Sequence, residues 1–164
     1  MKLTKIETSP PIRIDTTVGT RIFAGDTMIH GDTGWRDMSQ FLVAGLAVSS
    51  NFGRARMKRV ASRVYFDLKL DVTQPGVTRV FDGIPIGFRA MSLYPMDNQI
   101  FTASTTGAGA SLLTSGTHVG VFYPNSSPLQ TGAATPWPEP GTIAWTSSYS
   151  TSDPWPTSLP GTPT

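Results

Sequence analysis

The sequence of 164 residues contains no cysteine, which excludes disulfide bridges, thiolate metal sites and thiol catalysis. Histidine occurs only as His30 and His118, far apart in the chain. Charged residues make up 15% of the total, well below the roughly 25% of an ordinary soluble domain. No stretch approaches the roughly 20 apolar residues of a membrane-spanning helix, so we expect no membrane span.

The common catalytic motifs are missing as well. The sequence has no Gly-x-Ser-x-Gly turn, no P-loop, no dinucleotide-binding glycine pattern and no His-Glu-x-x-His pair. Asp67 and Asp71 could form a glycosidase-like carboxylate pair, but they alternate with Lys69, as residues on the solvated face of a strand do. We therefore predict that the protein is not an enzyme and has no catalytic residue, metal site or cofactor.

The net charge is only +2, too small for the clustered basic face that binds nucleic acid, so no nucleic-acid partner is expected. One local basic run, RARMKR, occupies residues 54–59. It is either a patch that contacts phosphate groups or the exposed face of an edge strand, where charges block pairing between sheet edges. The edge-strand interpretation is the one that we favour, because the run leads directly into a clear strand.

The chain is rich in residues that favour turns, with 16 glycines and 14 prolines beside many serines and threonines. This composition indicates an all-β protein. The strongest local signal is strict alternation over residues 64–72, which predicts a half-buried antiparallel strand. A tight hairpin at residues 61–63 joins it to the basic run. A second layer must cover the apolar side of this strand.

We divide the chain into three parts. Residues 1–33 are expected to form an extended N-terminal arm, and residues 34–146 an antiparallel β-sandwich or jelly-roll-like head. Residues 147–164 form a Pro-rich C-terminal strap, because Pro154, Pro156, Pro160 and Pro163 each fix φ and remove a backbone donor.

The strap is too apolar for a plain linker, since it carries Trp155 and Leu159. A segment stiffened by proline loses little entropy when it docks. We expect it to pack on the sheet of its own chain or on a neighbouring copy. Trp35, Trp155 and Leu159 are the candidate contacts between subunits.

Several stretches resemble one known family. Residues 31–38 read GDTGWRDM, residues 84–90 read IPIGFRA, and the ending runs from Trp145 through residues 152–161, which read SDPWPTSLPG. Together with a basic hairpin at residues 57–62, they resemble the C-terminal domains of minor tail and tail-fibre proteins of tailed phages, especially those that infect actinobacteria. The resemblance spans about residues 31–161. The sequence departs from the family at the hairpin glycine, here Ala61-Ser62, and at Ala90, which replaces a proline.

The resemblance implies a β-sandwich or jelly-roll head, commonly a homotrimer, displayed on a virion and used in host attachment. We therefore expect a minor tail or fibre head module. Its N-terminal arm would bind other virion proteins, and its exposed loops would meet a cell-envelope glycan. In a trimer, the face of the strand at residues 64–72 and the strap would supply buried contacts. The candidate receptor-binding residues are Thr105, Thr106, Asn125, Gln130 and Trp137.

Two other functions compete with this expectation. The same module could decorate a capsid, or form a head fibre, anchored to the shell by its N-terminal arm. A wall-degrading enzyme is the third possibility, which the missing catalytic residues disfavour.

Overall fold

Strands account for nearly all of the regular structure. The structure is a computed structural model that describes residues 10–74, 77, 79–89, 101–102, 109–115, 118–124 and 141–164. Within these residues every strand pairing between named strands is antiparallel, and the one helical element is a single 3-10 turn, η1 (Ser39–Phe41). The prediction of an all-β antiparallel protein is confirmed.

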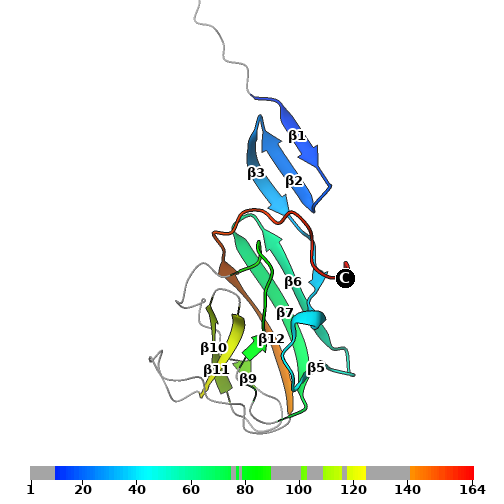
Figure 1. Ribbon diagram of the computed structural model, residues 1–164, viewed down its shortest axis with the longest axis vertical. Coiled ribbons are helices and arrows are strands. Elements are labelled where there is room, and N and C mark those ends of the chain that lie inside the picture. Colours follow the sequence, from blue (N-terminus) through cyan, green and yellow to red (C-terminus); the bar gives the residue numbers. More distant parts are fainter. Residues whose placement is uncertain are drawn as a thin grey trace, which may run out of the picture.

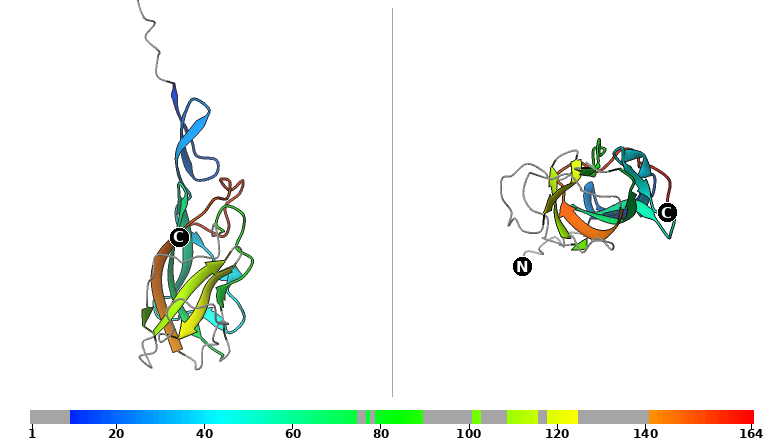
Figure 2. Two further views of the ribbon diagram at one scale, coloured as in Figure 1. Left: turned by 90° about the vertical axis from the view of Figure 1, so that its left-hand side faces the viewer. Right: turned by 90° about the horizontal axis from the view of Figure 1, so that it is seen from below.

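The strands form two sheets. The larger sheet has the order β1 (Ile12–Asp15), β2 (Thr20–Ala24), β3 (Thr27–Asp32), β6 (Arg54–Val60), β7 (Arg63–Val72) and β12 (Gly141–Ser150). Two short strands join it, β4 (Arg36–Asp37) beside β6 and β5 (Leu46–Val48) beside β7. The smaller sheet has the order β8 (Arg79–Phe81), β11 (His118–Pro124), β10 (Gly109–Ser115) and β9 (Phe101–Thr102). Figure 2 shows the smaller sheet beside the layer that holds β7 and β12.

The hairpin β6–β7 forms as its sequence pattern predicts. The two strands pair in register from Arg54 opposite Lys69 to Val60 opposite Arg63, across the two-residue turn Ala61-Ser62. Ala61 takes a positive φ of 49°, a conformation that a glycine would adopt at lower cost. This turn is therefore made without the glycine of the family pattern.

The apolar face of β7 is buried within the chain itself. Val64, Phe66, Leu68 and Leu70 are fully buried. They belong to one hydrophobic cluster whose other members include the residues Met57, Phe81, Ile84, Phe88 and Ile143. The expectation that this face supplies contacts in a trimer is therefore wrong, because the chain's own residues already cover it.

Residues 10–33 do not form an extended arm. They form a three-stranded antiparallel sheet, β1–β2–β3, which we call the N-terminal meander and which stands above the body of the molecule (Figure 1). The sharp turn at Gly25-Asp26, where Gly25 has φ 61°, folds β3 back on β2. Asp15 closes the other turn by accepting hydrogen bonds from the backbone N–H and the hydroxyl of Thr17. The tight turns therefore fold the segment that was expected to be extended into a sheet. Residues 1–9 lie outside the described residues.

The last strand is longer than expected. β12 continues to Ser150 and pairs with β7 along its whole length, so residues 147–150 belong to the sheet rather than to the strap. The C-terminal segment, residues 151–164, then crosses between the body and the N-terminal meander (Figure 1).

Candidate functional site

The five candidate receptor-binding residues, Thr105, Thr106, Asn125, Gln130 and Trp137, lie outside the described residues. The candidate subunit contacts Trp35, Trp155 and Leu159 are described, and all three are partly buried. Trp155 lies below the N-terminal meander, whereas Trp35 lies on the outward face of β6 and β7.

Trp155 connects the C-terminal segment to the N-terminal meander. Its indole Nε1–H donates a hydrogen bond of 3.0 Å to the carbonyl oxygen of Val18. Its ring lies against Gly31 of β3, where a Cβ would come within 2.5 Å of a ring carbon. These contacts fill space and satisfy the indole donor inside one chain, and the partly exposed ring leaves its role between subunits a prediction.

Arg59 is the buried centre of this region. It is only 5% exposed and donates hydrogen bonds of 2.7–2.9 Å to the carbonyl oxygens of Ala61, Gly87, Asp153 and Pro154. Burial lowers the pKa of Arg59, and the Asp153 carboxylate opposes that shift; the guanidinium remains charged at neutral pH. The acceptors hold three segments together around one side chain, because they come from the β6–β7 turn, the loop before residue 90 and the C-terminal segment.

The carboxylate of Asp153 reinforces the same contact. It accepts hydrogen bonds from the backbone N–H groups of Gly87, at 2.7 Å, and Arg89, at 3.2 Å. Gly87 has φ 98°, and a Cβ there would lie 2.8 Å from Pro156. A side chain at this position would therefore strain the backbone and push the C-terminal segment away.

Arg36 of β4 attaches the end of the chain. Its Nε and Nη2 donate hydrogen bonds to the carbonyl oxygens of Pro160, at 3.0 Å, and Gly161, at 2.6 Å. The backbone N–H of Asp37 donates to the carbonyl oxygen of Thr162, at 2.9 Å. We call the contacts made by Gly31, Arg36, Arg59 and Gly87 with residues 151–164 the joint.

Charged side chains cover the outward face of β6 and β7. Arg56 stands opposite Asp67 in the register of the two strands. One oxygen of the Asp67 carboxylate accepts hydrogen bonds from Arg54 Nε, at 2.6 Å, and Arg56 Nη2, at 2.8 Å, and the other accepts from the Thr146 hydroxyl, at 3.1 Å. Burial alone would raise the pKa of Asp67, but these hydrogen bonds offset it and lower the pKa below its ordinary value.

Trp35 lies on this outward face rather than in the joint's centre. The guanidinium carbon of Arg56 lies 4.8 Å from its ring centroid, and Lys58 Nζ lies 5.1 Å from it. Lys58 Nζ also lies 5.6 Å from the ring centroid of Tyr65. Cations at such distances over aromatic faces attract the ring electrons. The result is an alternating row of cations and rings along β6.

The edge-strand interpretation of the basic run is wrong. β6 is an interior strand, paired with β7 on one side and with β3 and β4 on the other. Charges on it therefore do not protect a sheet edge. The sequence alone could not show this, since the pairing with β4 depends on Arg36 and Asp37 returning to β6.

Asp67 and Asp71 do not form a paired carboxylate site. Asp71 accepts a hydrogen bond of 2.9 Å from the Thr142 hydroxyl, whereas Asp67 is held by two arginines. In the part of the chain that the structure describes, no three histidine, cysteine, aspartate or glutamate side chains gather so as to hold a metal ion. No helix in that same part is long and apolar enough to cross a membrane.

Comparison of the chain with protein-family models, with curated proteins and with solved structures finds no match.

Proposed function

We propose that the chain is a virion structural protein of a tailed phage, a minor tail or fibre head module that attaches to the host surface as a homotrimer. One observation carries this proposal. The three separate stretches that resemble the phage family lie against one another in the joint, although they are far apart in the sequence.

Each stretch contributes a contact that depends on its own motif residue. Gly31 of the first stretch receives the ring of Trp155 from the third. Arg36 of the first donates to Gly161 of the third. Gly87 of the second donates its N–H to Asp153. These residues all hold the joint together. Their presence in one sequence therefore supports an architecture shared with the phage family over a chance match of composition.

The finer description of the fold belongs to the same proposal. An eight-stranded and a four-stranded sheet, with one hydrophobic cluster that includes residues of β7 and β8, support a β-sandwich or jelly-roll-like head. The N-terminal meander supports attachment to other virion proteins. It exposes Ile12, Ile14 and Ile29, which are 64%, 65% and 56% exposed, and apolar surface of this kind marks interaction sites.

A capsid decoration or head-fibre protein is the second candidate. The meander favours it, because a compact sheet with exposed isoleucines at one end of the molecule suits insertion between shell subunits. The two candidates differ in where the protein sits on the particle, and both predict a virion location.

Immunogold labelling of purified virions with antibodies to the chain tests the proposal. Gold at the tail tip supports the tail or fibre function, and gold over the shell supports decoration. Absence of the chain from virions, checked by mass spectrometry of the same particles, would overturn both. Light scattering of the purified chain should give about three times its 17.6 kDa for the trimer; a stable monomer would contradict self-assembly in solution.

A further inference from the structure

The outward face of β6 and β7 carries an excess of positive charge. Five basic residues lie on it, against two acidic ones. The basic ones are Arg54, Arg56, Lys58, Arg63 and Lys69, and the acidic ones are Asp67 and Asp71. On the neighbouring strand β4, Asp37 stands opposite Arg56, but its carboxylate is hydrogen-bonded to the backbone N–H and hydroxyl of Ser39.

The fold does not need this arrangement. Arg54 stands directly opposite Lys69 in the sheet, and like charges so placed destabilise a sheet. Arg54 and Arg56 share a single oxygen of Asp67. Among the described residues, Lys58 and Lys69 form no ion pair. Positive charge that the acidic groups of the same face do not balance therefore favours an anionic partner.

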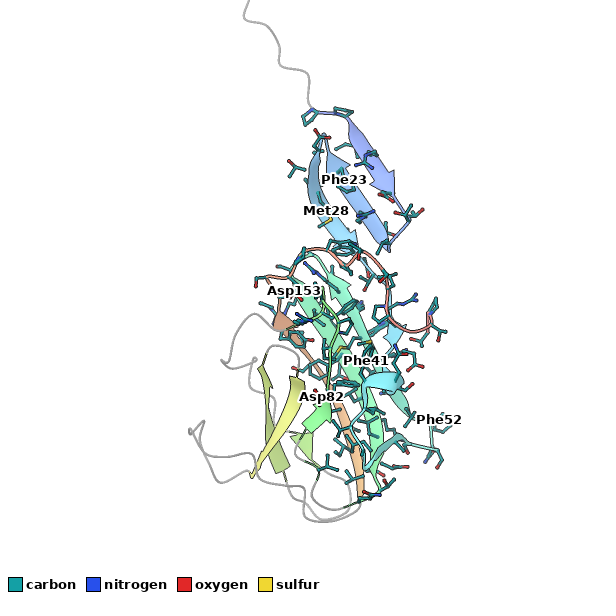
Figure 3. All side chains as sticks on the ribbon, in the orientation of Figure 1. Phe23, Met28, Phe41, Phe52, Asp82 and Asp153 are labelled. Carbon is teal, nitrogen blue, oxygen red and sulfur yellow. The ribbon has the colours of Figure 1, made fainter. Side chains whose placement is uncertain are left out.

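Aromatic rings accompany the cations. Trp35 and Tyr65 lie beside Lys58. Phe52 precedes β6, is 87% exposed and projects from the outer edge of the molecule (Figure 3), with Lys69 Nζ 6.0 Å from its ring centroid. Phe52 also has a positive φ of 56°, which costs a non-glycine residue conformational energy. An exposed phenylalanine held in a strained turn is costly to the fold and points to a contact with a ligand.

Hydroxyl groups complete the face. β12 lies beside β7, and Thr142, Thr146 and Ser148 stand opposite Asp71, Asp67 and Tyr65. Flat apolar rings pack on the faces of sugars, while hydroxyl and carboxylate groups exchange hydrogen bonds with sugar hydroxyls. Guanidinium groups bind carboxylate and phosphate.

We propose that the outward face of β6, β7 and β12 binds an acidic polysaccharide, a sugar polymer that bears carboxylate or phosphate groups. This inference rests on the proposed function and moves its glycan contact from the loops to the sheet. A nucleic acid fits less well. Duplex DNA carries one negative charge per roughly 1.7 Å of helix axis, and the carboxylates of Asp67 and Asp71 interrupt the basic row. An acidic polysaccharide carries its charges farther apart, so that its uncharged parts can face Asp67 and Asp71. Its hydroxyl groups can then donate hydrogen bonds to these two carboxylates.

Binding of the full chain to immobilised polymers tests the proposal. Polygalacturonate supplies carboxylates, phosphomannan supplies phosphates, neutral dextran supplies neither, and a 20-nucleotide oligothymidine represents nucleic acid. We expect binding to at least one acidic polysaccharide, weakened by salt, and none to dextran; comparison of the two acidic polymers identifies the preferred anion. Equal binding to dextran, no binding to either acidic polymer, or tighter binding to oligothymidine would overturn the proposal.

Two variants locate the site. Lys58→Gln should weaken binding to the acidic polymer about fivefold or more, since it removes one charge-assisted contact. Arg13→Gln removes one charge from the exposed N-terminal meander and should leave binding unchanged. Equal effects of the two variants would show that only overall charge matters and would refute the site.

Phe52→Gly separates a binding role from a structural one. It should raise the stability of the chain, because glycine adopts a positive φ freely, and yet weaken polysaccharide binding severalfold. Unchanged binding would remove Phe52 from the site. Failure of the inference and failure of the proposed function remain distinguishable. If virions are labelled but Lys58→Gln binds the acidic polymer as the original chain does, only the proposed site is rejected. If the chain binds the polymer but virions are not labelled, only the phage function is rejected.

Discussion

The body of the molecule and the N-terminal meander are both antiparallel sheets, but they are stabilised differently. All fifteen buried hydrophobic side chains among the described residues come from Met38 or later in the chain. The meander has none. Its Phe23, seen with Met28 in Figure 3, is covered by the guanidinium of Arg13, 4.2 Å from the ring centroid. The comparison teaches that a sheet without a buried hydrophobic core can keep a defined place when other segments hold it. Here β6 holds the meander through its pairing with β3, and Trp155 holds it through Val18 and Gly31.

Removing one phenylalanine from each region should give the largest contrast. Phe66→Ala in the body deletes a fully buried ring and should lower the free energy of unfolding by about 3–5 kcal/mol. Phe23→Ala in the meander loses partial burial and a cation–π contact and should cost about 1 kcal/mol. Urea denaturation of both variants measures the difference. Similar losses of unfolding free energy in the two variants would mean that Phe23 belongs to a core shared with the body and that the two regions unfold together.

Arg59→Lys tests the centre of the joint. An ammonium group cannot reach all four carbonyl oxygens that the guanidinium binds, so buried acceptors lose partners and we expect a loss of about 2–3 kcal/mol. Arg13→Lys, at an exposed position, is the matched control and should change stability by less than about 0.5 kcal/mol. An unchanged stability of the Arg59→Lys variant would show that water replaces the lost hydrogen-bond donors.

Trp155→Leu should act on one region only. It removes the hydrogen bond to Val18 and the ring that packs on Gly31, at a cost of about 1–2 kcal/mol. Hydrogen exchange should accelerate in β1–β3 and stay slow in β6 and β7, because local stability follows local contacts. Gly31→Ala should reproduce the pattern, since its Cβ would displace the same ring. Uniform acceleration across both regions would refute a local role.

The smallest effect is expected on the outward face of the body, with Asp67→Asn. The pKa of Asp67 is lowered in the folded chain, so its stabilisation is present above about pH 4, the ordinary range of an aspartate, and is lost as the pH falls through the lowered value. The variant should be about 1 kcal/mol less stable at pH 7 and should lose less stability on acidification. We would measure the stability of both proteins as a function of pH. An equal loss on acidification in the variant and the original chain would contradict a stabilising role of the Asp67 carboxylate.

Much of the body could be predicted from the sequence. Period-two alternation identified the strand at residues 64–72, and its five apolar residues are all at most 2% exposed. A local pattern suffices there, because strand geometry sends alternate side chains to opposite faces. The same alternation marks Arg59 as a residue on the apolar face, together with Ala55 and Met57, and this was the available signal of its burial.

The joint could not be predicted in the same way. Three of the four acceptors of Arg59 lie 28 to 95 residues away in the sequence, and Trp155 binds Val18 at a separation of 137 residues. Nothing local in the sequence specifies such partners. Asp67 was expected on a solvated face for the same reason, because its burial depends on Arg54 and Arg56 folding over it.

The long sequence separations in the joint also order the steps of folding. The β6–β7 hairpin is local and can close early, whereas contacts across more than a hundred residues form slowly because a long loop must close first. During synthesis from the N-terminus, β3 can pair with β6 early, but the contacts of Trp155 with Val18 and Gly31 form only after residue 155 has left the ribosome. Completion of the meander's attachment is therefore a late event, and a ribosome-bound chain would present to any partner nearby a meander that is held to the body only through β3 and β6.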